Sequence, residues 1–209
     1  RIVFRVMQPH IGLALLDFGT CRLTQGMRVM AIYDQASIHH SPEEGALSPD
    51  GTHLAFAEWP AAREGQERAA LPTIYVRDLA AGVDVVVGEG FGVVWSRDGR
   101  WIADTGADGI HVAKPDATAD RLVVPYQSPD GYKQALIREA WPPLASWSPD
   151  SKWLVYHKCI LQPGLKTQCG SHIEDYSIFK VDVETGEETK IVDGGLNPYW
   201  RQRQPTTSP

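Results

Sequence analysis

The sequence predicts an all-β fold, a β-propeller of about four blades that are each a four-stranded antiparallel sheet. The first observation is compositional, because 209 residues include 19 Gly, 15 Pro and 7 Trp. So many turn-forming residues favour many short elements and argue against a helical bundle. The second observation is a segment that recurs roughly every 50 residues, a period at which one repeat forms one propeller blade. The third is that each repeat has the turns and alternating apolar strands of an antiparallel meander.

The repeat is clearest in three segments of the chain. They read LSPDGTHLAFAEW at residues 47–59, WSRDGRWIADTG at 95–106 and WSPDSKWLVYHK at 147–158. Residues 1–7 (RIVFRVM) match only the second half of this pattern. The apolar anchors are 52, 48 and 52 residues apart, at Ile2, Leu54, Ile102 and Leu154. This regular spacing predicts equivalent strands in successive blades.

Each repeat contains a Ser-Pro-Asp-Gly type turn before an alternating strand such as residues 53–57 or 153–157. Pro presets the backbone angle φ of such a turn, and Asp accepts hydrogen bonds from nearby backbone N–H groups. Gly adopts a positive φ without steric cost. We therefore expect structural turn roles for Ser48, Asp50, Gly51, Asp98, Gly99 and Asp150.

The rest of each repeat predicts two further strands joined by a second turn with Asp and Gly. The third strands are expected at residues 13–16, 73–76, 109–112 and 177–181. The fourth strands are expected at residues 21–24, 84–87, 121–124 and 188–192. A further Ser-Pro-Asp-Gly string at residues 128–131 is followed by polar residues, so residues 126–143 are interpreted as an insertion.

These turns and strands resemble the TolB-type, WD-like β-propeller repeat. The resemblance rests on residues 48–51 followed by Ile-Tyr-Val-Arg-Asp at 74–78, and on the copies at 95–99 and 147–151. It covers about residues 1–200, with Leu47 in place of Trp and Ser151 in place of Gly as departures. It implies a propeller but little about function, because one fold supports many activities. Many family members have six or more blades, whereas this chain has about four repeats.

The domain prediction is a propeller over residues 1–201 and a polar, Pro/Thr-rich tail over residues 202–209. The first repeat begins at a second strand, and residues 197–200 (NPYW) resemble a first strand. One hypothesis is that residues 197–200 pair with residues 1–6 and close a four-bladed ring, which removes exposed sheet edges. The other is that the chain is part of a larger propeller. The sequence leaves both hypotheses open.

Charge and hydropathy exclude some classes of partner. The chain has 20 Lys+Arg against 26 Asp+Glu, a net charge of -6. Without a basic stripe it is a poor candidate for binding nucleic acid or anionic lipid. No apolar run approaches the roughly 20 residues of a membrane helix, so no membrane span is expected.

The cysteines bear on the cellular compartment. Cys159 and Cys169 lie on either side of Pro163-Gly164, a turn signal that would bring the two sulfurs together. A disulfide there would favour a periplasmic or extracellular location, whereas two free thiols would fit a reducing compartment. A zinc site is disfavoured because no C-x-x-C spacing is present. The role of Cys21 is undecided.

No motif in the chain specifies catalysis, and we expect neither metal nor cofactor. A serine hydrolase would need a Gly-x-Ser-x-Gly motif, which is absent. His39 and His40 are adjacent, so on an extended segment they point in opposite directions and do not easily share one ion. The glycine-rich residues 88–92 lack the Lys-Ser/Thr ending of a phosphate loop and are interpreted as a flexible link between blades.

The leading prediction is a non-catalytic platform for a protein, peptide or glycan, alone or within a larger extracytoplasmic assembly. Aromatic residues outside the repeat pattern are the candidate binding anchors, although they could instead cover the blade ends. These candidates are Trp59, Tyr126, Tyr132 and Trp141. The alternatives are a hydrolase or lyase with a site in the central channel, or the regulatory propeller of a prolyl-oligopeptidase-like peptidase. A polar cluster in the channel or a bound metal would favour an enzyme.

Overall fold

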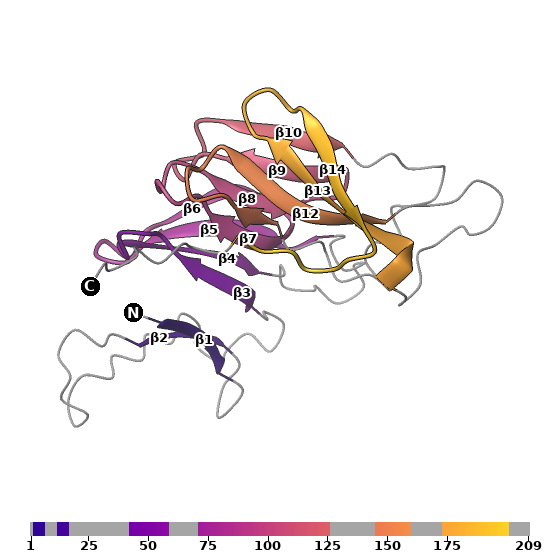
Figure 1. The fold of residues 1–209 in the computed structure, drawn as a ribbon. Helices are drawn as coiled ribbons and strands as arrows, with labels where there is room; N and C mark the ends of the chain where they lie inside the picture. The colour runs from indigo at the N-terminus through magenta and orange to yellow at the C-terminus, as the bar shows by residue number, and fades with distance from the viewer. Residues whose placement is uncertain are drawn as a thin grey trace, which may run out of the picture.

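Figure 1 shows the computed structural model, in which three four-stranded sheets stand side by side. The structure describes residues 2–6, 12–16, 42–58, 71–125, 145–159 and 173–200. Each four-stranded sheet is an antiparallel meander in which sequence neighbours are also hydrogen-bonded neighbours. No helix in these described ranges is long and apolar enough to cross a membrane.

The three large sheets correspond to the three full repeats, and we call them blades 1, 2 and 3. Blade 1 contains β3 (Pro42–Leu47), β4 (His53–Glu58), β5 (Thr73–Asp78) and β6 (Asp84–Glu89). Blade 2 contains β7 (Phe91–Trp95), β8 (Ile102–Thr105), β9 (Gly109–Ala113) and β10 (Asp120–Pro125). Blade 3 contains β11 (Ser146–Trp147), β12 (Trp153–Cys159), β13 (Tyr176–Asp182) and β14 (Glu188–Asp193), with a short 3-10 helix, η1 (Ile173–Asp175), before β13. A two-stranded sheet of β1 (Ile2–Val6) and β2 (Gly12–Leu16) precedes them.

The strands expected in the three full repeats are confirmed, as is the strand expected at residues 13–16. The strand expected at residues 21–24 and the insertion at 126–143 lie outside the described residues, as does the tail at 202–209. The hypothesis that residues 197–200 pair with residues 1–6 finds no support among the described residues, where β1 pairs with β2 alone and residues 197–200 form no strand. Instead, the backbone N–H of Trp200 donates to Ser146 Oγ at 3.2 Å.

The Ser-Pro-Asp-Gly turns are small hydrogen-bonded units. In the first, Ser48 Oγ donates to Asp50 Oδ1 at 2.6 Å and accepts the backbone N–H of His53 at 2.9 Å. The hydrogen bond from Ser48, together with those from Thr52, lowers the pKa of Asp50 to about 2. Gly51 takes the positive φ that the sequence predicts, 70°. The same Ser–Asp bond recurs in the other two turns, at 2.7 Å for Ser96–Asp98 and 2.5 Å for Ser148–Asp150.

Alternating residues of each strand point to the two faces of a blade and build the cores between neighbouring blades. One cluster joins blades 1 and 2, and includes Ala55, Ile74, Val76, Ile102 and Ala113. Another joins blades 2 and 3, and includes Ile110, Val112, Trp147, Leu154 and Tyr156. The first strands are also linked, because the indole N–H of Trp95 donates to the carbonyl of Ala46 at 2.8 Å, and that of Trp147 to Val94 at 3.2 Å.

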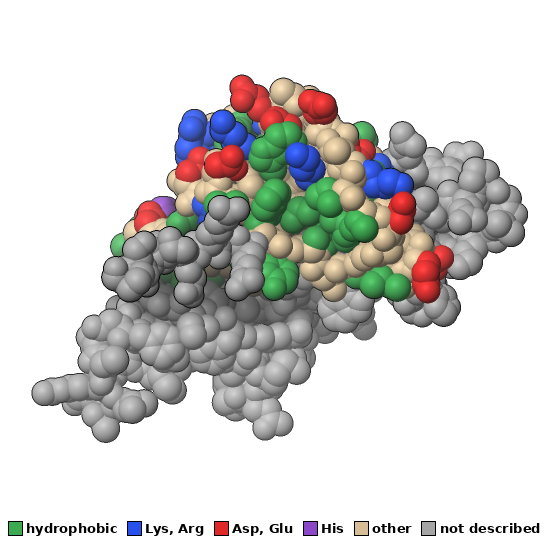
Figure 2. Space-filling model, viewed as in Figure 1, with side chains coloured by type: hydrophobic (Ala, Val, Ile, Leu, Met, Phe, Trp, Pro, Cys, Tyr) green, Lys and Arg blue, Asp and Glu red, His purple; other side chains and the backbone are tan. Residues whose placement is uncertain are grey.

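The face of blade 3 that points away from blade 2 is partly covered by residues 194–200. The backbone N–H of Asn197 donates to His157 Nδ1 at 3.2 Å. A Cβ atom at Gly195 would lie 2.8 Å from Ile178, so the backbone packs closely here. Figure 2 shows hydrophobic side chains gathered over this face, which also carries Val192 at 50% exposure, and Tyr199 in the covering segment is 79% exposed.

Candidate functional site

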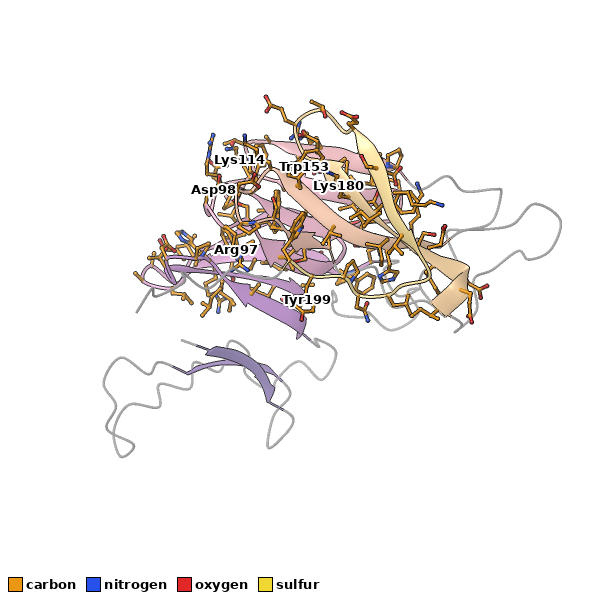
Figure 3. The ribbon with its side chains drawn as sticks, in the orientation of Figure 1. Arg97, Asp98, Lys114, Trp153, Lys180 and Tyr199 are labelled. Atoms are coloured by element: carbon orange, nitrogen blue, oxygen red, sulfur yellow. The ribbon has the colours of Figure 1, made fainter. Side chains whose placement is uncertain are left out.

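The blades have two different edges because every strand reverses direction at its end. The Ser-Pro-Asp-Gly turns and the short hairpins at residues 79–83, 114–119 and 183–187 form one edge, which we call the turn edge. Figure 3 shows Arg97, Asp98 and Lys114 of this edge on the left of the sheets. The opposite edge, which we call the loop edge, is where β4, β8, β10 and β12 end.

The aromatic candidates lie outside the described residues, but the chain positions from which they depart are known. Trp59 directly follows the end of β4, and Tyr126 directly follows the end of β10. Tyr132 and Trp141 fall in the segment between β10 and β11, and Cys169 falls between β12 and η1. The proposed Cys159–Cys169 disulfide therefore stays untested. All these segments leave the sheets at the loop edge, so this edge is where a site is to be sought.

The loop edge of blade 2 carries a polar pair that breaks the repeat. In blade 1 the second and third strands contribute Phe56 and Tyr75, stacked with ring centroids 5.5 Å apart. In blade 3 the equivalent pair is Tyr156 and Phe179, stacked at 6.2 Å. In blade 2 the pair is instead Asp104 and His111, directly opposite each other in the β8–β9 register.

Asp104 lies in the interior between blades 1 and 2, where a carboxyl group is unexpected. Its residue exposure is 5%. Burial raises the pKa of Asp104 to about 7, although the nearby charge of His111 acts in the opposite direction. Within the described ranges, no residue donates a hydrogen bond to this carboxylate. A buried carboxyl group in this state exchanges its proton near neutral pH and lacks a partner for its ionised form.

His111 is held between two other carboxylates. Its Nε2 lies 2.8 Å from Asp108 Oδ1, and its Nδ1 lies 3.2 Å from Asp120 Oδ1. Burial alone would lower the pKa of His111, but the hydrogen bonds to Asp108 and Asp120 and the charge of Asp104 raise it overall. Only the imidazolium form can donate from both ring nitrogens at once, so this geometry favours the protonated ring.

Two glycines line the pair. A Cβ atom at Gly90 would lie 2.6 Å from the carbonyl oxygen of Thr105 and 2.7 Å from Asp104 Oδ1. A Cβ atom at Gly106 would approach the His111 ring to 3.2 Å. Gly90 is also the single residue between β6 and β7, and its N–H donates to the carbonyl of Pro72 at 2.9 Å. The run at residues 88–92 was predicted to be a flexible link between blades, but its ends belong to β6 and β7, and the link itself is the closely packed Gly90.

The arrangement favours charge recognition over metal binding. Within the described residues, no group of three or more His, Cys, Asp and Glu side chains could hold a metal ion. Both nitrogens of His111 are already engaged by carboxylates, which leaves no free imidazole lone pair for a metal. The pair can instead exchange protons near neutral pH or accept hydrogen bonds from a ligand at Asp104.

The loop edge is acidic in the part of the chain that the structure describes. The lysines that reach it, Lys158 and Lys190, are paired with Glu188 and Asp193 at 3.0 and 2.8 Å. Its carboxylates are Glu58, Glu89, Asp104, Asp108, Glu174, Asp175 and Asp193. The turn edge is mixed, since it carries acidic groups together with Arg97, Arg100, Lys114, Arg121 and Lys152.

Comparison with known proteins shows structural likeness but no sequence relative, because neither a family model nor a curated protein matches the chain. A TolB-like protein from Agrobacterium tumefaciens superposes with a TM-score of 0.56 and 18% identity, over 94% of this chain and 62% of that one. A nidogen/laminin complex gives 0.54 and 15%, over 93% and 62%. Dipeptidyl peptidase 4 from Porphyromonas gingivalis gives 0.52 and 11%, over 91% and 32%.

The fold is that of a β-propeller. At these identities the similarity extends to the fold alone, and the similar proteins include both enzymes and binding proteins. This chain spans less than two thirds of the length of each of them.

Sequence reasoning missed Asp104 and His111, although a signal for each is visible. Aligned on Leu54, Ile102 and Leu154, the repeats read LAFAE, IADTG and LVYHK. Asp104 therefore occupies a position where the other two repeats have an aromatic residue. His111 has the same kind of signal, because the third strands read TIYV, GIHV and SIFK, with Tyr75 and Phe179 at the equivalent position. Only the pairing across the sheet shows that the two departures face each other.

Proposed function

We propose that this propeller is a non-catalytic binding platform that engages a protein, peptide or glycan partner at its loop edge. The supporting observation is the difference between the two edges. The turn edge is closed by short turns whose backbone and Asp groups hydrogen-bond to each other. Three longer segments and the Asp104–His111 pair meet the loop edge, and loops on a rigid scaffold are where binding residues concentrate.

A propeller hydrolase or lyase is the second candidate, and one observation favours it. A carboxyl group with a pKa of about 7 beside a histidine has the properties of a general acid or base. Against this, both nitrogens of His111 face Asp108 and Asp120, and none faces a described nucleophile. The pair also lies between blades 1 and 2 on the second and third strands, whereas a channel site would use the first strands. A regulatory propeller of a peptidase is a third candidate, which rests on fold likeness alone.

The proposal has two further parts. One is kinship with the TolB-type, WD-like repeats, and the other is a periplasmic or extracellular location. The Ser–Asp turn geometry repeated in all three blades supports the kinship. The location depends on the Cys159–Cys169 bridge. Mass measurement of the natively purified protein after alkylation, with and without reductant, should show two thiols protected until reduction. Three reactive thiols without reductant would remove the argument for an oxidising compartment.

The platform is tested by screening the purified protein against peptide and glycan arrays. We expect binding that is weakened by Asp108→Asn at the loop edge and unchanged by the matched Asp116→Asn at the turn edge. Asp116 is a suitable control because its carboxylate makes only local bonds to Thr118, and an Asn side chain can still accept them. The proposal would be contradicted if both substitutions changed the affinity for a partner equally. It would also be contradicted if the protein turned over an array substrate and this turnover needed Asp104.

A further inference from the structure

We infer that Asp104, together with Asp108, forms a binding site for a cationic group, the ammonium or guanidinium of a basic peptide segment. This inference rests on the proposed platform function and selects one partner class from the three that it allows. A glycan of neutral or acidic sugars does not provide such a group, whereas a lysine or arginine side chain does.

The first support is that Asp104 is buried without a partner. It takes a position that is aromatic in both other blades, so the fold itself does not require a carboxylate there. Asp104 has 5% exposure, and among the described residues it receives the charge of His111 but no hydrogen bond. A local departure of this kind from the repeat pattern is expected at functional or strained sites.

The second support is that His111 does not neutralise the site. Its two ring nitrogens are bound to Asp108 and Asp120, at 2.8 and 3.2 Å. One imidazolium therefore faces three carboxylates, those of Asp104, Asp108 and Asp120. The excess charge is negative once Asp104 ionises, and a ligand cation would balance it. Arginine would add two parallel hydrogen bonds to one carboxylate.

The third support is that glycine backbone, and no competing side chain, packs against the pair, while a second acceptor lies at the surface. Gly90 and Gly106 present only their backbone to Asp104 Oδ1 and to the His111 ring. A Cβ atom at Gly90 would lie 2.7 Å from Asp104 Oδ1, so any other residue would obstruct it. Asp108, whose side chain is 62% exposed, provides a second acceptor at the surface.

The fourth support is the charge of the whole edge. The described carboxylates at the loop edge outnumber the lysines there, and both lysines are already paired. The three segments that leave this edge do not compensate, since residues 59–70, 126–144 and 160–172 together carry five Lys or Arg and four Asp or Glu. An acidic edge steers cationic partners toward it and discriminates against anionic ones.

The test uses the full chain and three short acetylated peptides that differ only in carrying Arg, Lys or Gln at two positions. Binding is followed by calorimetry at low salt and by the ring resonances of His111. We expect the Arg and Lys peptides to bind and to shift these resonances, and the Gln peptide to do neither. Asp104→Asn, which keeps the shape and removes the charge, should weaken the Arg peptide about tenfold or more, because a charge-assisted bond is lost. Asp116→Asn should leave the affinity unchanged.

Equal binding of the Arg and Gln peptides, undisturbed His111 resonances, or wild-type affinity in Asp104→Asn would each overturn the inference. The proposed platform can be judged separately. If the arrays yield a neutral peptide or a glycan that depends on Asp108 but not on Asp104, the platform stands and the cationic site falls. If the arrays and the peptides all fail to bind, both fall.

Discussion

Asp104 on β8 lies directly opposite His111 on β9, in the place where blades 1 and 3 each hold a stacked aromatic pair. Because two blades hold an aromatic pair at this place, the fold itself does not require the charged pair that blade 2 holds there. Stacked aromatic pairs contribute packing energy, whereas a buried carboxylate without a hydrogen-bond partner is unfavourable. A polar pair at such a position is most simply explained by a role outside folding.

Restoring the aromatic pair should therefore stabilise the protein. We expect the double substitution Asp104→Phe/His111→Tyr to raise the free energy of unfolding by about 1–3 kcal/mol, because it removes an unsatisfied buried carboxyl and adds a stacked pair. Chemical denaturation of both proteins at neutral pH measures the change. Asp104→Asn serves as a control that fits the existing space beside Gly90. If the double variant is markedly less stable than Asp104→Asn, then Asp104 and His111 support packing that the aromatic pairs do not replace.

Asp104 should contribute a loss of stability as the pH rises from about 4 to about 7. In the unfolded chain Asp104 ionises near its ordinary pKa of about 4, whereas in the folded protein its pKa is about 7. Between these values the folded protein holds the additional proton, so raising the pH favours unfolding. His111 acts in the same direction above about 6.5, because its pKa is also raised in the fold. Asp108 and Asp120 face the same ring.

The pH dependence is isolated by comparing the wild-type protein with Asp104→Asn in denaturation curves at matched pH. The difference in unfolding free energy between them should change with pH between about 4 and 7, with each unit of pKa shift worth about 1.4 kcal/mol. Parallel curves for the two proteins would show that Asp104 titrates normally in the folded state.

Two glycines in one short run should respond differently to the same substitution. Gly90→Ala should destabilise the protein by about 1–3 kcal/mol, because its Cβ would lie 2.6 Å from the Thr105 carbonyl oxygen and 2.7 Å from Asp104. Gly88→Ala should be close to neutral, since a Cβ there meets nothing within 4 Å. Thermal and chemical denaturation of the two variants provide the comparison. Equal stability of the two would mean that the link between β6 and β7 is not closely packed against β8.

Acidification should release residues 194–200 from blade 3. His157 accepts the backbone N–H of Asn197 at Nδ1, which requires that nitrogen to be unprotonated. Burial lowers the pKa of His157, so the bond should be intact above about 6.5 and lost as the pH falls through the lowered pKa of the folded state. Hydrogen exchange of the Asn197 amide should then accelerate, relative to amides of β13, as the pH is lowered. A constant ratio between these amides would exclude the switch.

The sequence predicted the repeats because local rules specify them. The turns at Ser48–Asp50 and its two copies use only residues a few positions apart, so their hydrogen bonds follow from spacing alone. The alternating strands after each turn are equally local. The pairing of residues 197–200 with residues 1–6 is a contact between distant segments, and sequence alone could not decide between it and the observed contact of Trp200 with Ser146.

The sequence by itself determined the fold class, the blade boundaries and the turn residues, because a repeated pattern of turns and apolar alternation has few other solutions. Only the tertiary structure brought Asp104, His111, Asp108 and Asp120 into one group. Strand register decides that grouping, and register depends on how neighbouring strands pair and pack. A carboxyl group also acquires its unusual pKa only when the folded blades remove water from it, which no linear pattern records.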